Sequence, residues 1–89
     1  MTNYLVECYW PGVDAERLMQ TAERLSVPQP PLEPVRWINA TLIPDDEIVL
    51  CLAEGSAPEA VRASAEVAGL PAERIVAAIT VVVTDPHSH

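Results

Sequence analysis

The sequence predicts a small α+β sandwich with the element order strand, helix, strand, strand, helix, strand. Apolar runs rich in β-formers mark four strands, two amphipathic stretches mark helices, and clusters of proline and glycine separate them. The chain has 89 residues, of which 49% are hydrophobic, so it can bury one small core. We expect a single domain over residues 1–84 and a short tail over residues 85–89.

The first half of the chain contains a strand, a helix and a second strand. Residues 3–10 are rich in β-formers and stop at a Pro-Gly turn signal. Asp14 suits a helix cap, and the tetrad Ala-Glu-Arg-Leu recurs in the helix that follows, which gives it an apolar stripe of Ala15, Leu18, Ala22 and Leu25. The proline-rich residues 27–34 exclude helix and inner strand, so they form a stiff loop before a strand over residues 35–43.

The second half repeats the order strand, helix, strand. After a Pro-Asp-Asp turn, residues 47–54 return as the third strand. Ser56 begins a Ser-Ala-Pro-Glu capping box, and the helix that it opens runs to Ala68, with Gly69 as its stop signal. Residues 74–83, which are rich in β-branched side chains, are predicted as the last strand.

Two strand–helix–strand halves in tandem indicate the ferredoxin-like sandwich, a four-stranded antiparallel sheet with both helices on one face. The first and third strands are expected in its centre. The other sheet face, which we call the open face, has no cover within the chain. We therefore expect a homodimer of the dimeric α+β barrel type that packs largely through its sheets.

The charge excludes several classes of partner. The chain has no lysine, five arginines and thirteen acidic residues, for a net charge of −8. Nucleic acids and anionic membranes attract basic surfaces, so neither is expected as a partner. No apolar run is long enough for a membrane span and the N-terminus lacks a signal region, which predicts a cytoplasmic protein. A metal ion, a small molecule or another protein remains possible as a binding partner.

The stretch Arg36 to Leu42 alternates between an apolar side and a side with an indole, an amide and a hydroxyl. A hairpin that pairs Ile43 with Ile48 puts Trp37 opposite Glu54. The open face is then predicted to carry Glu7, Tyr9, Trp37, Asn39, Thr41, Leu50, Leu52 and Glu54. The helix side is predicted to carry Ile38, Ala40, Leu42, Val49, Cys51 and Ala53.

These open-face residues suggest a ligand pocket, with Tyr9, Trp37, Asn39 and Thr41 as binding residues. If the protein is an enzyme, Glu7 and Glu54 are the catalytic candidates. A carboxylate desolvated by Trp37 would titrate above about 4.3 and could move protons in a cofactor-free isomerisation or cyclisation. No nucleotide loop is present, so no organic cofactor is predicted. The alternative is that these residues are solvated or form a dimer contact.

Several segments resemble a family of small bacterial ferredoxin-like domains of unknown function that is linked to nickel binding. They are YLVE at 4–7, Trp37, Cys51 with Glu54, EAVR at 59–62 and AGLPAERI at 68–75. The resemblance implies the ferredoxin-like fold, a dimer, and nickel or another divalent metal as ligand. It also implies histidine at the positions of Asn39 and Ser64, which this chain lacks.

Few other side chains are candidates to coordinate a metal ion. His87 and His89 are the only histidines and could bind a transition metal weakly. Cys8 and Cys51 are predicted to be buried free thiols on the helix side of adjacent strands. Three hypotheses therefore stand: a metal-binding protein, a small-molecule-binding dimer or cofactor-free enzyme, and an accessory dimer without chemistry. The sequence leaves open whether the protein is an enzyme.

Overall fold

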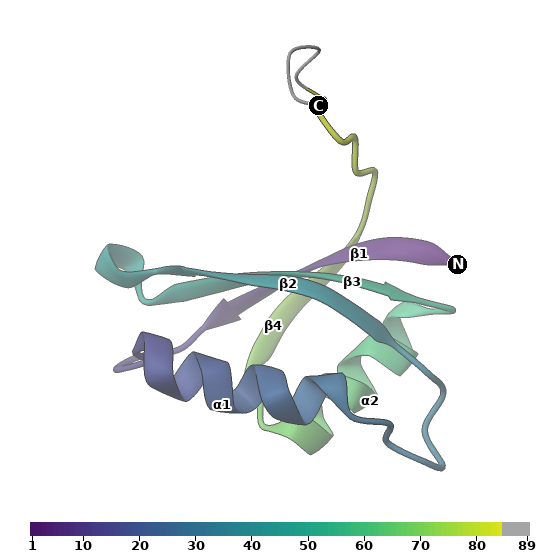
Figure 1. Ribbon diagram of the computed structural model, residues 1–89, viewed down its shortest axis with the longest axis horizontal. Helices are drawn as coiled ribbons and strands as arrows, with labels where there is room; N and C mark the ends of the chain where they lie inside the picture. Colours follow the sequence, from purple (N-terminus) through teal and green to yellow (C-terminus); the bar gives the residue numbers. More distant parts are fainter. Residues whose placement is uncertain (85–89) are drawn as a thin grey trace.

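The computed structural model describes residues 1–84 and contains four strands and two helices in the predicted order (Figure 1). A single 3-10 turn, η1 (Pro44–Asp46), joins the second and third strands. The bounds are β1 (Thr2–Tyr9), α1 (Ala15–Ser26), β2 (Arg36–Ile43), β3 (Ile48–Gly55), α2 (Pro58–Ala68) and β4 (Ala72–Ala78). Neither helix in this part of the chain has the length and apolar character that crossing a membrane would require.

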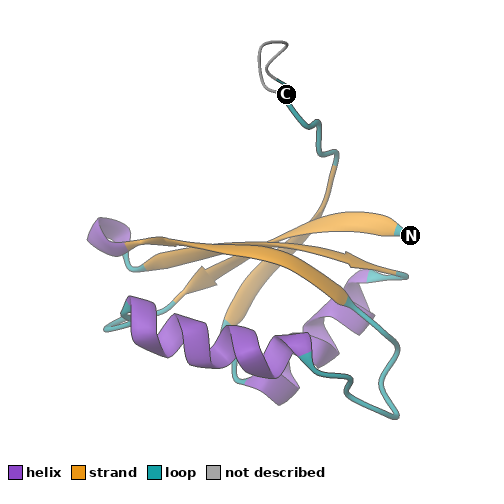
Figure 2. Ribbon diagram, in the orientation of Figure 1, coloured by secondary structure: helices purple, strands orange, loops and turns teal. Residues whose placement is uncertain are grey.

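The four strands form one antiparallel sheet in the order β2-β3-β1-β4. Both helices cover the same face of this sheet, and the open face carries no element of the described chain (Figure 2). The ferredoxin-like fold and the central position of β1 and β3 are therefore confirmed. The two edge strands are β2 and β4.

The core lies between the sheet and the helices, and the strand alternation predicts it well. On the two central strands every second side chain is buried, and the inward faces of α1 and α2 pack over these side chains. The buried side chains of these elements are Tyr4, Val6 and Cys8 of β1, Val49, Cys51 and Ala53 of β3, Leu18, Thr21 and Leu25 of α1, and Val61, Ser64, Ala65 and Ala68 of α2. Asp14 caps α1 as predicted, because its Oδ1 accepts a hydrogen bond of 2.8 Å from the backbone N–H of Arg17.

The start of α2 differs from the predicted capping box. The N-cap is Ala57, with no side-chain cap, and Pro58 follows in the first turn. Ser56 lies one residue before the cap, so its hydroxyl cannot reach the first free N–H groups of the helix. The hydroxyl instead donates to a carboxylate oxygen of Glu33 in the proline-rich loop. Ser56 thus ties that loop to the end of β3.

The last strand is shorter than predicted at its C-terminal end: β4 stops at Ala78 rather than at residue 83. Its sheet partner β1 begins at Thr2, and the antiparallel register pairs Asn3 with Ala78. The pairing ends there, and residues 79–83 are exposed beyond it. High β-propensity cannot form a strand without a neighbouring strand.

The prediction of which sheet face each side chain of β2 occupies was wrong at the N-terminal end of the strand. Trp37 pairs with Ala53 and Asn39 with Leu52, so Ile38 is an extra residue in a β-bulge. Paired residues share a sheet face, and Ala53 is fully buried under the helices. Trp37 therefore faces the helices, whereas Ile38, predicted to be in the core, is 39% exposed. Asn39 and Thr41, paired with Leu52 and Leu50, lie on the open face as predicted.

Candidate functional site

A partly buried polar network holds Trp37 on the helix side of the sheet. The indole Nε1–H donates a hydrogen bond of 2.9 Å to the hydroxyl of Ser64, which is 1% exposed on α2. Ser64 donates in turn to Oε1 of Gln29, and Nε2 of Gln29 donates to the backbone carbonyl of Ser64 at 3.2 Å. The network joins β2, α2 and the proline-rich loop, so these three side chains serve to position elements of the fold.

The open face has an apolar centre between two ion pairs. The register puts Leu5, Leu52 and Val76 in one row across β1, β3 and β4, next to Leu50, and all are only half-buried. Arg74 contacts Glu7 at 3.2 Å on one side of this centre. Arg36 contacts Glu54 at 3.5 Å on the other side. Half-buried leucines within a polar rim are typical of a protein interface.

The predicted carboxylates do not converge on one site. Glu7 is opposite Leu50, whereas Glu54 is opposite Asn3, four residues further along β1. At about 3.3 Å per residue this offset alone separates them by roughly 13 Å. Each carboxylate also has an arginine partner and is about one-third exposed, with side-chain exposures of 38% for Glu7 and 32% for Glu54.

The other predicted ligand-binding residues divide into two groups. Tyr9 is 51% exposed and shares a hollow of about 300 Å³ with Glu7, Ile48 and Arg74. Asn39 and Thr41 lie on the edge strand β2, two strands away from β1. Trp37 belongs to the opposite face. The structure therefore brings Glu7 and Tyr9 together and separates them from Trp37 and Glu54.

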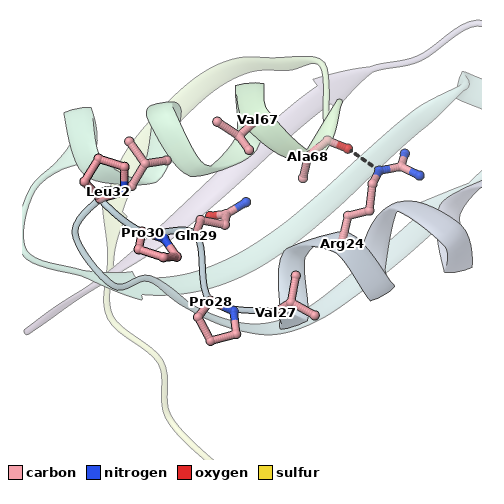
Figure 3. Close-up of a pocket in the computed structure, with 9 residues that line it drawn as sticks. Arg24, Val27, Pro28, Gln29, Pro30, Leu32, Val67 and Ala68 are labelled. Atoms are coloured by element: carbon pink, nitrogen blue, oxygen red, sulfur yellow. Dashed lines mark hydrogen bonds between the residues drawn. The ribbon is translucent and has the colours of Figure 1, made fainter.

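A larger cavity lies under the proline-rich loop, where the sequence predicted only a stiff connection (Figure 3). It has a volume of about 440 Å³ and lies between the C-terminal ends of α1 and α2. Its walls are mostly apolar and comprise Val27, Pro28, Pro30, Pro31, Leu32, Val67 and Ala68. Val27 and Leu32, the apolar residues among the prolines of this loop, were the available sequence signal for it.

The polar side chains that line this cavity already have partners in the protein. Arg24 donates from Nε to the carbonyl of Ala68 at 2.9 Å and from Nη2 to the hydroxyl of Thr21 at 3.0 Å (Figure 3 draws the first of these). Gln29 is engaged with Ser64. The guanidinium of Arg24 thus satisfies a free backbone carbonyl at the C-terminal end of α2, where a positive charge is favourable. The cavity can accept an apolar group, with little polar chemistry to orient it.

The two cysteines are buried free thiols, as predicted. Cys8 is 1% exposed and Cys51 is 0% exposed, and the register makes them diagonal neighbours on the helix side of β1 and β3. A side-chain hydrogen bond with Cys51, followed by burial, raises the pKa of Cys8 above its ordinary value of 9.0. Because both thiols are buried, the pair behaves as small core residues rather than as nucleophiles.

This burial predicts that neither thiol reacts in the folded protein. A thiol reagent added at pH 8 should label Cys8 and Cys51 only at the rate of unfolding, because attack requires an accessible thiolate. Intact-mass measurement over time in buffer and in denaturant gives the two rates. Full labelling of the native protein within minutes would contradict the placement of these cysteines beneath the helices.

Comparison with known proteins identifies the family. A family model described as "Nickel responsive protein SCO4226-like" matches residues 4–77. The chain belongs to this family. The crystal structure of SCO4226 from Streptomyces coelicolor A3(2) is similar over 90% of this chain and 99% of that one, with a TM-score of 0.78 and 22% sequence identity. That likeness supports the fold. No curated protein matches the chain significantly.

The residues described by the structure do not fit a nickel site. Nickel favours imidazole ligands, and within residues 1–84 there is no histidine and no cluster of three or more histidine, cysteine or acidic side chains. At the two positions where the resemblance implies histidine, Ser64 is buried in the Trp37 network and Asn39 lies on the opposite sheet face. His87 and His89 lie outside the described residues.

Proposed function

We propose that this member of the SCO4226-like family is a homodimer with a nickel-linked role and that its C-terminal histidines are its contact with the ion. Membership of a family of nickel-responsive proteins carries this proposal. The donor set directs the ion to His87 and His89, since they are the only imidazoles in the chain. Two imidazoles alone form an incomplete coordination sphere, so the predicted affinity for nickel is low.

The open face supports the dimer. Its half-buried centre of Leu5, Leu50, Leu52 and Val76 is continuous across three strands. Packing two such faces together removes these side chains from water, which stabilises by roughly 25 cal/mol per Å² of apolar surface. The ion pairs Glu7–Arg74 and Glu54–Arg36 then lie on the rim, where charged groups are tolerated. Sedimentation of a dimer at tens of micromolar is expected.

Titration of the full chain with Ni²⁺ tests the ion contact. We expect weak, calorimetrically measurable binding that falls at least about tenfold in a His87→Ala/His89→Ala variant, because imidazole nitrogen is replaced by no donor at all. A Glu7→Gln/Glu54→Gln variant serves as the matched control and should bind as the parent does. Unchanged affinity in the histidine variant, with loss in the glutamate variant, would place the ion on the open face and contradict the proposal.

The enzyme hypothesis receives no support from the open face. It required Glu7 or Glu54 to be desolvated by Trp37, and Trp37 lies beneath the sheet. Both carboxylates are instead paired with arginines and partly exposed.

A further inference from the structure

The cavity beneath the proline-rich loop is not used by the function proposed above. It lies on the helix side of the sheet, whereas the proposed dimer packs through the open face (Figures 1 and 3). A second copy packed on the open face would therefore leave this cavity accessible. Its volume of about 440 Å³ lies within the range of about 300–1,000 Å³ that is typical of small-molecule pockets.

Aliphatic side chains from both helix ends and from the loop line this cavity. Val27 directly follows α1 and is 57% exposed, and Val67, the last residue but one of α2, is 65% exposed. Leu32 of the loop is half-buried. Valine and leucine are among the residues most often buried in proteins. One small apolar molecule in this cavity would remove all three side chains from water.

The loop side of the cavity is held in place by the protein itself. Three of its lining residues are prolines, and each proline ring fixes one backbone torsion. The Gln29 side chain makes two hydrogen bonds with Ser64, and the backbone N–H of Leu32 donates to the carbonyl of Gln29 at 2.8 Å. Further along the loop, Glu33 accepts a hydrogen bond from Ser56. A wall fixed in this way loses little conformational freedom when a ligand binds, which favours affinity.

The charges around the cavity favour a neutral occupant. Among the described residues that line it there is no acidic side chain, so a cation would have no partner. Arg24 lines it mainly with its alkyl stem, because Nε and Nη2 are bonded to Ala68 and Thr21 and the end of the guanidinium points away from the loop (Figure 3). The net charge of −8 also opposes an anion. A charged group buried here would lose its hydration without compensation.

We propose that this cavity is a binding site for a compact, neutral aliphatic molecule, held between Val27, Leu32 and Val67. Burial of apolar surface supplies the affinity, and the size and charge of the cavity supply the selectivity. The site is separate from the histidines and from the open face, so the proposal is independent of the nickel contact and of the dimer.

A nuclear magnetic resonance titration with three cage compounds of the same shape tests the site. At pH 7 adamantanol is neutral, adamantanecarboxylate is an anion and adamantylamine is a cation. We expect adamantanol to shift the methyl resonances of Val27, Leu32 and Val67, with a dissociation constant on the order of 1 mM. The two charged cages should bind at least about fivefold more weakly, because their charged groups lose water without gaining a partner.

A serine variant of the two valines tests the location of the site. The Val27→Ser/Val67→Ser protein loses aliphatic wall on both helices and should bind adamantanol at least about tenfold more weakly. Met19→Ser is the control, because Met19 is 67% exposed on α1, close to the exposure of Val67, and does not line the cavity. Its affinity for adamantanol should equal that of the parent. All three substituted residues are exposed, so both variants should keep the circular dichroism of the parent.

Several results would overturn the proposal. The first is the absence of shifts at the three wall residues with adamantanol at its solubility limit. Binding of the carboxylate as tightly as the alcohol would exclude a neutral site and assign the ligand to Arg24. Equal affinities of the serine variant and the control, or shifts confined to Leu5, Leu50 and Leu52, would place the ligand elsewhere on the molecule.

Discussion

Replacing Trp37 by alanine is expected to lower the free energy of unfolding by about 3 kcal/mol. The substitution removes an indole that packs against the core and donates to Ser64, and it leaves a cavity between β2 and α2. Trp37→Phe keeps most of the ring contact and loses the Nε1–H donor, so its cost should be closer to 1 kcal/mol. Urea denaturation of the three proteins measures both differences.

Asn39→Ala is the matched control, two residues along the same strand. Asn39 is exposed on the open face, so its loss should change the free energy of unfolding by less than about 0.5 kcal/mol. A second check is a double-mutant cycle between Trp37→Phe and Ser64→Ala, where a coupling of about 1 kcal/mol is expected for a hydrogen-bonded pair. A Trp37→Ala protein as stable as the control would show that the indole lies on the open face after all.

Introducing a charge at the centre of the open face should separate the proposed dimer. Leu52 lies between Leu5 and Asn39 in the register and is half-buried in the single chain. In a Leu52→Lys variant, the packed faces would bury two unpaired ammonium groups, each at a cost of several kcal/mol. We expect the dissociation constant to rise at least about 100-fold, which corresponds to about 2.8 kcal/mol. Sedimentation over a concentration series measures it.

Gln20→Lys makes the same change of charge on the exposed face of α1 and should leave the dimer intact. Both variants should retain the far-ultraviolet circular dichroism of the parent, because neither position is in the core. Equal dissociation constants for the two lysine variants would exclude the open face as the dimer interface. They would also direct the search for the interface to the helical side of the molecule.

The sequence predicted the fold well because its signals are local and mutually consistent. The alternation of Tyr4, Val6 and Cys8 marks the inward face of β1 directly, and Asp14 and Gly69 mark helix ends through their own backbone chemistry. Such features depend on a few neighbouring residues. These features do not depend on distant parts of the chain, so the element order and the central strands could be predicted from them.

The errors arose where the outcome depends on distant parts of the chain. Whether residues 79–83 form a strand depends on a neighbouring strand to pair with, and the pairing of β4 with β1 ends at Ala78. Whether Trp37 faces in or out is decided by a single unpaired residue, Ile38, and by a hydroxyl on α2. The candidate site was affected most, since one reversed side chain removed the wall of the predicted pocket. The cavity beneath the prolines depends on three separate elements.

The bulge at Ile38 also bears on how the protein avoids aggregation. Edge strands with regular backbone groups are templates on which further chains can stack, and natural sheets interrupt them. At Ile38 the hydrogen-bonding row of β2 loses its regular spacing, so a strand growing along this edge would meet an irregular segment after five residues. The one-residue bulge therefore limits the length over which this edge can pair with a further strand. This disfavours fibre growth without any change in the charge of the surface.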